Sequence, residues 1–268
     1  MVQNIFLGPA GSPEKSTISG IETIRKLGLQ AMEVEFTYGV RMSNALAKKI
    51  GKINKKEKIK LSVHAPYWIN LASTDKKKIE ASKKRILTSC ERAHYMGASP
   101  VVFHPAFYGK LEKEKIYDMV KTAVIEMNDI IKKNKWSVKL APETTGKHSQ
   151  FGTLDELIKL SKEVKCFICV DFAHIYARNG GKINYSDILK KMKSLRHIKH
   201  YHSHFSGIEF TAKGEKRHTI MSKPAFRPLA KEILKKKMSI TIISESPVTW
   251  KDSQKQKKIF EDFGYKFS

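Results

Sequence analysis

The chain has 268 residues, of which 51 are lysine or arginine and 26 are aspartate or glutamate, so its formal net charge is +25 at pH 7. A chain of this length can bury a sizeable core, and we expect one domain over residues 1–268. The charge favours a polyanionic partner such as nucleic acid over a small neutral one, although a lysine-rich solvated surface gives the same balance.

The three cysteines, Cys90, Cys166 and Cys169, are an odd number and too few for a disulfide framework, which indicates a reducing compartment. The opening MVQNIFLGPAGSP lacks both a basic segment and a long apolar segment, and nowhere do eighteen apolar residues run together. We therefore expect a cytoplasmic protein without membrane contact, acting as a monomer.

Short apolar, β-rich runs alternate with stretches of helical period along the whole chain. The first helices are predicted over 16–27, ending at Gly28, and from Ser43 to Gly51, because glycine commonly follows the last turn of a helix. The predicted strands cover residues 5–8, 31–36, 60–66, 100–105, 137–143, 166–172, 197–205 and 239–245.

The second half of the chain continues this alternation. Apolar residues recur at three- and four-residue spacing from Ile116 to Ile131, and Thr153 with Glu156 forms a capping box that begins another helix. Eight strand–helix repeats predict an α/β fold, the single-domain (β/α)8 TIM barrel with parallel strands. An open doubly wound sheet is the alternative, but no glycine-rich phosphate loop follows the first strand.

Metal-binding side chains stand where six consecutive predicted strands end. In a barrel, these ends converge on the C-terminal rim, which is the catalytic face. Imidazoles and carboxylates without thiolates suit zinc or manganese, and a carboxylate such as Glu143 can bridge two ions. Paired ions promote displacement at phosphorus. The six residues are His64, His104, Glu143, Asp171, His204 and Glu245.

Side-chain alternation along the strands tests this geometry. Cys169 lies on the same face of its strand as Asp171 and Cys166 on the other, so CFIC is interpreted as two small core residues and not a chelating pair. The positions two residues before the predicted ligands are small or apolar, as a packed barrel interior requires: Ser62, Val102, Ala141 and Ile243.

Several segments carry a resemblance to a known family, in order and over nearly the whole chain. The sequence resembles the endonuclease IV family of apurinic/apyrimidinic endonucleases, and the HAPY and DFAH segments are the most specific. The resemblance implies a barrel similar to sugar isomerases, three zinc ions and incision of double-stranded DNA 5′ to an abasic site, in base excision repair. The segments are LSVHAPYWINLAS, VVFHPAF, LAPETTGKHSQFGT, CVDFAHIYARNGG, HFSG, KRH and SESP.

Carried over by residue, the resemblance implies a role for each candidate ligand. His64 and His104 would hold the first zinc, and Glu143 would bridge it to the second and be essential for catalysis. Asp171, His204 and Glu245 would complete the second site. His174 and His218 would belong to the third.

One position departs from the family pattern. Where the family has Asp-Arg-His, this chain has Lys216-Arg217-His218, and a protonated lysine cannot bind zinc. Three outcomes are open: Glu215 reaches in, the third ion binds weakly or not at all, or Lys216 faces the phosphate as a catalytic group. We favour the last two together and expect two tightly held ions.

The segment after HAP is expected to contact DNA. Trp68, next to Tyr67, would fill the gap left by an extruded sugar, and the alternative is that Trp68 packs beneath the next helix. An abasic nucleotide stacks on nothing, which lowers the cost of extruding it. The candidate phosphate contacts are Arg41, Lys147, Arg178 and Arg217.

Two other functions remain open. A sugar isomerase or epimerase on the same barrel would need one divalent ion, held by Glu143, Asp171, His204 and Glu245, whereas the additional histidines and the net charge favour the nuclease. A DNA-binding relative with weakened nuclease activity rests only on Lys216. Glu33 and Glu35 are predicted to point inward, as an acid or base near the site or as partners of buried lysines.

The segment HYHSHFSG carries three of the histidines at two-residue spacing. His200, His202 and His204 therefore share one face of their strand, with His204 at the rim. His202 lies one layer down and is interpreted as a hydrogen-bonded core residue, and His200 lies deeper still. His218 is assigned to the loop that follows.

Overall fold

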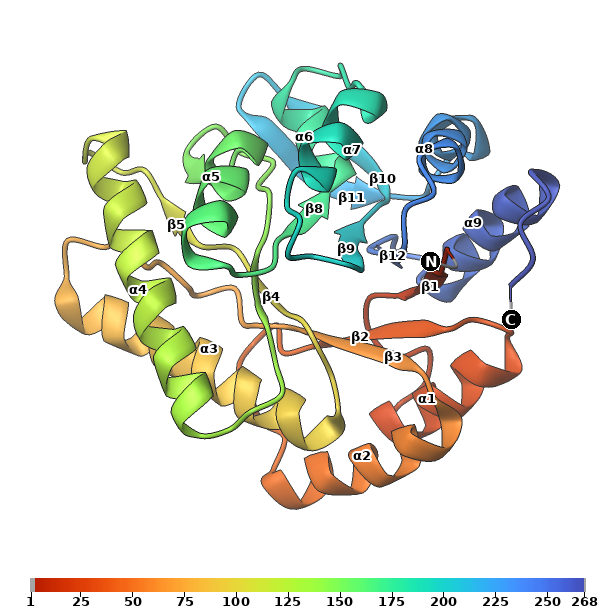
Figure 1. The fold of residues 1–268 in the computed structure, drawn as a ribbon, viewed down its shortest axis with the longest axis horizontal. Coiled ribbons are helices and arrows are strands. Elements are labelled where there is room, and N and C mark those ends of the chain that lie inside the picture. Colours follow the sequence, from red (N-terminus) through yellow and green to blue (C-terminus); the bar gives the residue numbers. More distant parts are fainter. Residues whose placement is uncertain (1–2, 268) are drawn as a thin grey trace.

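The computed structural model describes residues 3–267 and shows one closed barrel of parallel strands with helices on its outside (Figure 1). All eight predicted strands are present, and the predicted (β/α)8 fold is confirmed. The barrel strands are β1 (Ile5–Pro9), β2 (Ala31–Glu35), β3 (Lys60–His64), β4 (Val101–Phe103), β6 (Leu140–Pro142), β8 (Cys169–Asp171), β9 (Tyr201–His204) and β12 (Ile240–Ser244).

The barrel consists of two four-stranded parallel sheets. One has the order β2-β3-β4-β6 and the other β1-β12-β9-β8. Single backbone bridges join the sheets at both seams: Ala10 with Glu33 between β1 and β2, and Glu143 with Cys169 between β6 and β8. Two residues of interest for function, Glu33 and Glu143, therefore close the barrel with their own backbone.

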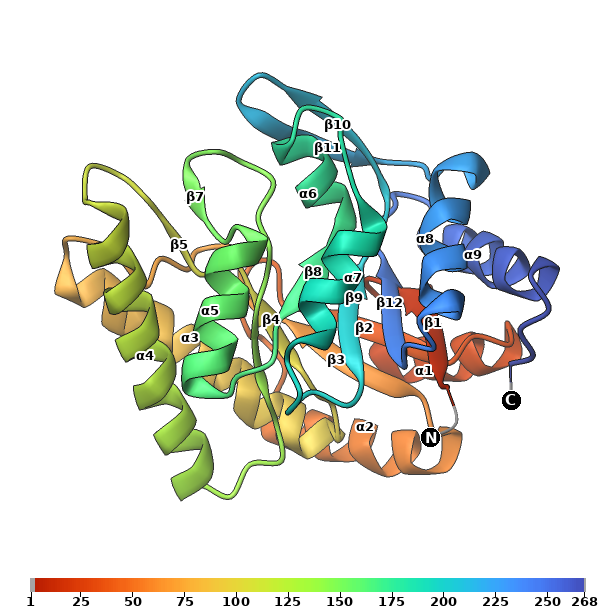
Figure 2. The ribbon, with the colours of Figure 1, turned by 45° about the horizontal axis from the view of Figure 1, so that its top comes forward.

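Helices cover the outer surface of the strands (Figure 2). The predicted capping box of Thr153 and Glu156 is present, and the first helix ends before Gly28, whose φ of 68° lies in the left-handed region. The helices are α1 (Thr17–Lys26), α2 (Asn44–Glu57), α3 (Lys76–Met96), α4 (Lys113–Lys133), α5 (Leu154–Val164), α6 (Phe172–Arg178), α7 (Tyr185–Lys193), α8 (Lys223–Lys235) and α9 (Trp250–Asp262).

The predicted end of the second helix at Gly51 is wrong, because α2 continues through Gly51 and ends at Glu57. A Cβ at this position would stand 2.2 Å from the backbone carbonyl oxygen of Tyr95 in α3. The glycine thus permits close packing of two helices and does not end one of them. The helix is instead capped by Lys58, which takes a left-handed conformation.

Two apolar regions form the core. The larger one lies between the strands and the helices and includes Cys166, whereas a small cluster inside the barrel contains Val102, Ala141 and Cys169. The two cysteines therefore lie on opposite faces of the strand region, as predicted, and all three cysteines are free thiols. The predicted positions beneath the ligands are all buried, including Ser62 and Ile243.

Two short antiparallel pairs are added at the C-terminal rim. Strands β5 (Ala106–Phe107) and β7 (Gln150–Phe151) form one pair, and β10 (Gly207–Thr211) and β11 (Gly214–Thr219) form a hairpin. The segment around His218, predicted as a loop, is therefore a strand of this hairpin, which packs against α6 (Figure 2). Among the described helices, each is too short or too polar to cross a membrane.

Candidate metal centre

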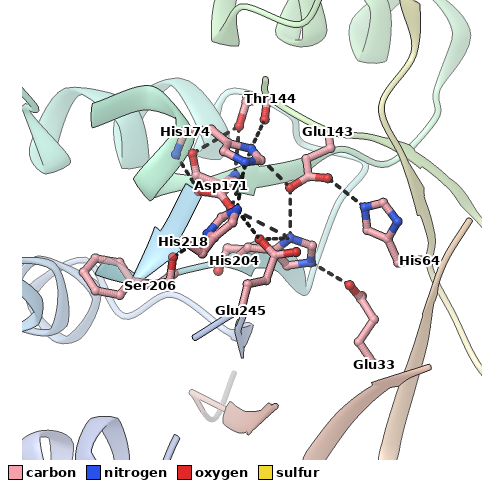
Figure 3. Close-up of polar contacts among 12 residues, drawn as sticks. Glu33, His64, Glu143, Thr144, Asp171, His174, His204, Ser206, His218 and Glu245 are labelled. Atoms are coloured by element: carbon pink, nitrogen blue, oxygen red, sulfur yellow. Dashed lines mark hydrogen bonds and ion pairs between the residues drawn. The ribbon is translucent and has the colours of Figure 1, made fainter. Parts of the chain in front are cut away.

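The six predicted strand-end residues come together at the C-terminal rim, and Figure 3 labels all of them except His104. Each stands at the last position of a barrel strand or directly after it, as in His64 of β3 and Glu143 after β6. All six side chains are buried or largely buried, and Glu143, Asp171 and His204 are fully so.

Glu143 lies between two sets of donors. Its Oε2 is 3.1 Å from His64 Nε2 and 3.0 Å from His104 Nε2, whereas its Oε1 is 2.9 Å from His204 Nδ1. The same His204 Nδ1 is 3.4 Å from Glu245 Oε2 and 4.0 Å from Asp171 Oδ2. Each oxygen of one carboxylate therefore serves a different set, as a bridge between two metal ions requires.

Two carboxylates in the second set carry an unsatisfied oxygen. Asp171 Oδ1 accepts a hydrogen bond of 2.7 Å from the backbone N–H of His174 and so caps α6. Asp171 Oδ2 and Glu245 Oε2, by contrast, are buried without a hydrogen-bond partner among residues 3–267. A buried anionic oxygen without a donor is costly, and a bound cation removes that cost. The donors therefore fit divalent metal ions.

Three histidines each use Nδ1 in a hydrogen bond away from the centre, which leaves Nε2 available for a metal ion. Because a carbonyl oxygen only accepts, His64 Nδ1 donates to Ala65 O at 2.8 Å, and His174 Nδ1 donates to Thr144 O at 2.8 Å. Ser206 Oγ donates to Gly207 O, so it accepts from His218 Nδ1 at 2.6 Å. In all three rings Nε2 then faces the centre, the arrangement found in metal-binding histidines.

Two residues that hold these ligands, Thr144 and Ser206, were not selected from the sequence, although both were visible in it. Each follows a predicted ligand closely, Thr144 directly after Glu143 and Ser206 two residues after His204. Thr144 also donates through Oγ1 to the backbone carbonyl of Asp171 and accepts from the backbone N–H of the same residue, so it ties β6 to β8. Small polar residues beside strand-end ligands are the signal that would have found them.

The ionisation of the cluster follows from burial and mutual attraction. Burial alone would raise the pKa of Glu143, but the charges of His204 and His104 hold it well below its usual range. Burial would lower the pKa of His64, yet the hydrogen bond to Glu143 and the nearby carboxylates raise it to about 10. Burial raises the pKa of Asp171 to about 7. Without metal, the cluster thus holds extra protons on its histidines, which bound metal ions would displace.

A third donor set lies beside the first two. His174 Nε2 is 3.3 Å from His218 Nε2 and 3.4 Å from Glu215 Oε2, and His218 Nε2 is 4.0 Å from Glu215 Oε1. Two imidazoles and a carboxylate are a suitable set for a zinc ion. Of the three outcomes considered above, the structure has Glu215 reaching in.

A β-bulge explains how Glu215 reaches the site. Residues of odd separation, such as Glu215 and His218, would lie on opposite faces of a regular strand. In the hairpin, Glu209 pairs with Arg217 but Phe210 pairs with Glu215, so Lys216 is an extra residue. The bulge shifts the alternation by one, and Glu215 joins His218 on the face toward the centre.

The expectation that Lys216 faces the substrate phosphate is therefore corrected. Its side chain is 61% exposed, and its ammonium pairs with Glu209 at 3.5 Å. Arg217, expected to contact phosphate, also pairs with Glu209 through two hydrogen bonds of 3.0 and 2.7 Å. Both cations lie on the outer face of the hairpin because the bulge turns them there.

Arg178, a predicted phosphate contact, also has a structural role. Its guanidinium donates to four oxygens of one rim loop, including the backbone carbonyls of Thr145, Lys147 and Gln150. All four bonds come from Nη1, so Arg178 holds the loop in shape through that one nitrogen. Lys147 itself is exposed and lines the pocket over the metal centre, and Arg41 is exposed in the loop after β2.

Aromatic side chains stand beside a pocket of about 440 Å³ that opens over the centre. Tyr67 lines it, and Trp68 is 60% exposed with its ring 6.3 Å from that of Tyr38. The alternative that Trp68 packs beneath the next helix does not hold. Most of the other lining residues are polar, among them His64, His104, His174, Glu215, His218 and Glu245.

Of the two inward glutamates of β2, Glu33 lies beneath the centre and pairs with histidines and not with lysines, whereas Glu35 stands at the pocket. Glu33 is fully buried and contacts His202 and His204. Glu35 lines the pocket, and burial raises the pKa of its carboxyl to about 8. His202 is a hydrogen-bonded core residue, as predicted, and His200 contacts Thr241 deeper in the barrel.

A closed (β/α)8 barrel with a rim cluster of histidines and carboxylates defines a class of metal-dependent barrel enzymes. The chain belongs to the xylose isomerase-like TIM barrel family, whose model matches residues 21–261. The resemblance to endonuclease IV is borne out by sequence relatives, and a solved endonuclease IV structure shares the fold.

Two relatives show how far the sequence similarity extends. An uncharacterized protein of Methanocaldococcus jannaschii is 38% identical over 91% of this chain and 92% of its own length. A protein of Mycoplasma mobile named "Probable endonuclease 4" is 29% identical over 69% of this chain and 68% of its own.

Solved structures share the fold at low sequence identity. Endonuclease IV from Thermus thermophilus superposes with a TM-score of 0.71, at 16% identity, over 97% of this chain and 98% of that one. A D-tagatose 3-epimerase-like protein superposes with a TM-score of 0.70, at 19% identity, over 93% of both. The fold is common to both structures and does not by itself distinguish a nuclease from an epimerase.

Proposed function

We propose that this protein is a metal-dependent apurinic/apyrimidinic endonuclease of base excision repair. It hydrolyses the phosphodiester 5′ to an abasic site in double-stranded DNA and leaves a 3′-hydroxyl and a 5′-deoxyribose phosphate. The observation that supports this most is Glu143, whose two oxygens face separate donor sets beside a third set. A single-metal enzyme would need only one of these sets.

The donors assign a place to each metal ion. His64, His104 and Glu143 would hold the first, and Glu143, Asp171, His204 and Glu245 the second. Imidazole and carboxylate donors favour zinc, and manganese is the alternative. When bound, such ions neutralise phosphate oxygens and supply hydroxide near neutral pH. Glu143 keeps the two positions adjacent because it reaches both.

The rim supplies the contacts that a damaged duplex would need. Tyr67 lines the pocket and the exposed ring of Trp68 follows it in the chain, so these rings can stack in the space left by an extruded abasic sugar. Lys147 lines the same pocket and can contact a phosphate. A net charge of +25 attracts DNA at long range and makes binding salt-dependent.

The second candidate, a sugar epimerase, rests on one four-residue group: Glu143, Asp171, His204 and Glu245 can hold a single ion. Proton transfer by paired glutamates needs carboxyl pKa values near the working pH. Here the neighbouring histidines hold the pKa values of Glu143 and Glu245 well below their usual range. His64 and His104 would also have no task in that reaction.

Incision of a defined duplex tests the proposal. A 5′-labelled duplex with one tetrahydrofuran abasic analogue should be cut by the zinc-loaded protein, and the product should carry a 3′-hydroxyl that a polymerase extends. EDTA and Glu143→Ala should each abolish the cut, because both remove the bridged pair. Asp252→Asn, which changes a fully buried carboxylate of α9 outside the rim, is the matched control and should retain incision.

Two outcomes oppose the proposal. Incision that survives both EDTA and Glu143→Ala would exclude a metal mechanism. Deuterium uptake from solvent into ketohexoses, without incision of the abasic duplex, would instead favour the epimerase.

A further inference from the structure

Glu33 of β2 makes contacts that the proposed chemistry does not use. Its carboxylate lies in the barrel interior, with no solvent exposure. Oε2 accepts a hydrogen bond of 2.9 Å from His202 Nε2. Oε1 lies 2.8 Å from His204 Nε2 and forms an ion pair with it, although the angle is too far from linear for a hydrogen bond. Figure 3 shows Glu33 approaching His204 from the side opposite Glu143.

This contact reverses the ring of His204 relative to the other histidines of the centre. His64, His174 and His218 give Nδ1–H to backbone or hydroxyl oxygens and turn Nε2 toward the donors. In His204, Nε2 meets Glu33, so Nδ1 faces Glu143 at 2.9 Å and Glu245 at 3.4 Å. A carboxylate only accepts, so it keeps the proton on Nε2 and leaves the Nδ1 lone pair for a metal ion.

We propose that Glu33 is a positioning residue that selects Nδ1 of His204 as the ligand of the second metal. His202 holds the other oxygen of Glu33 and so fixes the carboxylate from below. The partner is also charged, unlike the neutral oxygens behind the other three histidines, and a carboxylate behind an imidazole raises its basicity as a ligand. The inference rests on the metal centre of the proposed function, but not on the reaction performed there.

A competing interpretation places an additional ion beneath the rim. Cys169, His202 and His204 offer donor atoms within 4.8 Å of one another. Burial, however, raises the pKa of the Cys169 thiol well above its ordinary value, and only a thiolate binds metal well. The Nε2 atoms of both histidines also face Glu33. The structure favours a positioning role for the carboxylate over a buried ion.

Metal affinity and histidine tautomer test this without reference to DNA. We compare zinc affinity, by competition with a chromophoric chelator, in the full-length protein and in Glu33→Ala, Glu33→Gln and Asp252→Asn. Loss of a carboxylate behind a ligating histidine typically weakens metal binding by about 10–100-fold. Glu33→Ala should show that loss at one metal position. Asp252→Asn also removes a buried carboxylate and should leave the affinity unchanged.

Glu33→Gln keeps the shape of the side chain but removes its charge, so it separates these two effects. It also provides a second test if Glu33→Ala does not fold. The glutamine amide has one acceptor oxygen, so it can accept from one imidazole but not from both. We expect an intermediate loss of affinity. In zinc-loaded protein, two-bond ¹⁵N–¹H correlation spectra should show His204 protonated at Nε2 in the wild type and lose that signature in the variants.

The outcomes separate this inference from the proposed function. Unchanged zinc affinity and an unchanged His204 tautomer in either folded Glu33 variant would overturn it. Loss of one zinc equivalent in Cys169→Ser would overturn it in favour of the buried ion. If the wild type does not incise abasic DNA but Glu33→Ala still loses affinity, the proposed function fails and the role of Glu33 stands.

Discussion

Replacing Glu215 with alanine should remove the third metal ion, whereas replacing Lys216 should not. The two residues are neighbours on β11, but the bulge turns Glu215 toward His174 and His218 and leaves Lys216 outside, paired with Glu209. The pair of variants therefore isolates the effect of the bulge. The expectation of two tight ions, which assumed that no anionic ligand replaced the missing aspartate, becomes an expectation of three.

The structure sets the size of both effects. Glu215 Oε2 lies 3.4 Å from His174 Nε2, and Glu215 does not belong to the second donor set. Its loss leaves the two imidazoles with Asp171 and Glu245, carboxylates that the second donor set also uses, and we expect about 100-fold weaker zinc binding there, near 2.7 kcal/mol. The ion pair of Lys216 with Glu209 is exposed, and such pairs contribute roughly 0–1 kcal/mol to stability and nothing to metal binding.

Metal analysis of the dialysed proteins by plasma mass spectrometry is the assay, with circular dichroism to verify folding. The wild type and Lys216→Ala should retain the same zinc content, and Glu215→Ala should lose one equivalent. A full third equivalent in Glu215→Ala, or a loss in Lys216→Ala, would show that the bulge does not supply this ligand.

Three further predictions follow from the geometry. Trp68→Ala should weaken binding of the abasic duplex by about 1–3 kcal/mol in a fluorescence titration without changing the melting temperature, because the side chain is 60% exposed; equal loss for undamaged duplex would contradict this role. Gly51→Ala should destabilise the protein by about 1–3 kcal/mol in urea unfolding, since its Cβ meets Tyr95 O at 2.2 Å. In metal-free protein, folding raises the pKa of Glu35 from 4.5 to about 8 and of His64 from 6.5 to about 10. The folded state then binds more protons than the unfolded one, so stability should fall from pH 6.5 to 8 by roughly 1.4 kcal/mol per pH unit for each group, and the melting temperature should not rise over that range.

The barrel and the convergence of six rim side chains were predictable from the sequence for a local reason. Each candidate ligand stands at the end of a predicted strand, and parallel strands of a barrel end at one rim. His202 could likewise be assigned to the core, because side chains two residues apart share a face. Only the order of residues along one strand is needed in each case.

The remaining features depend on contacts between elements far apart in the chain. Pairing of β10 with β11 creates the bulge that presents Glu215, and a one-residue shift in that pairing is not visible in the sequence. Arg178 meets the loop around Lys147 only after folding. Gly51 resembles a helix end until Tyr95 of the next helix is placed beside it. In each case tertiary contacts override the local signal.

The barrel is built from two sheets, and the candidate metal ligands come from both of them. His64, His104 and Glu143 belong to the half that contains β2, and Asp171, His204 and Glu245 to the half that contains β1. At each seam an isolated backbone bridge and a few further hydrogen bonds join the halves. An ion bound by Glu143 together with residues of the second half would link the halves across the seam between β6 and β8, so metal loading should slow amide hydrogen exchange along that seam. Metal binding would then stabilise the joining of the two halves of the barrel.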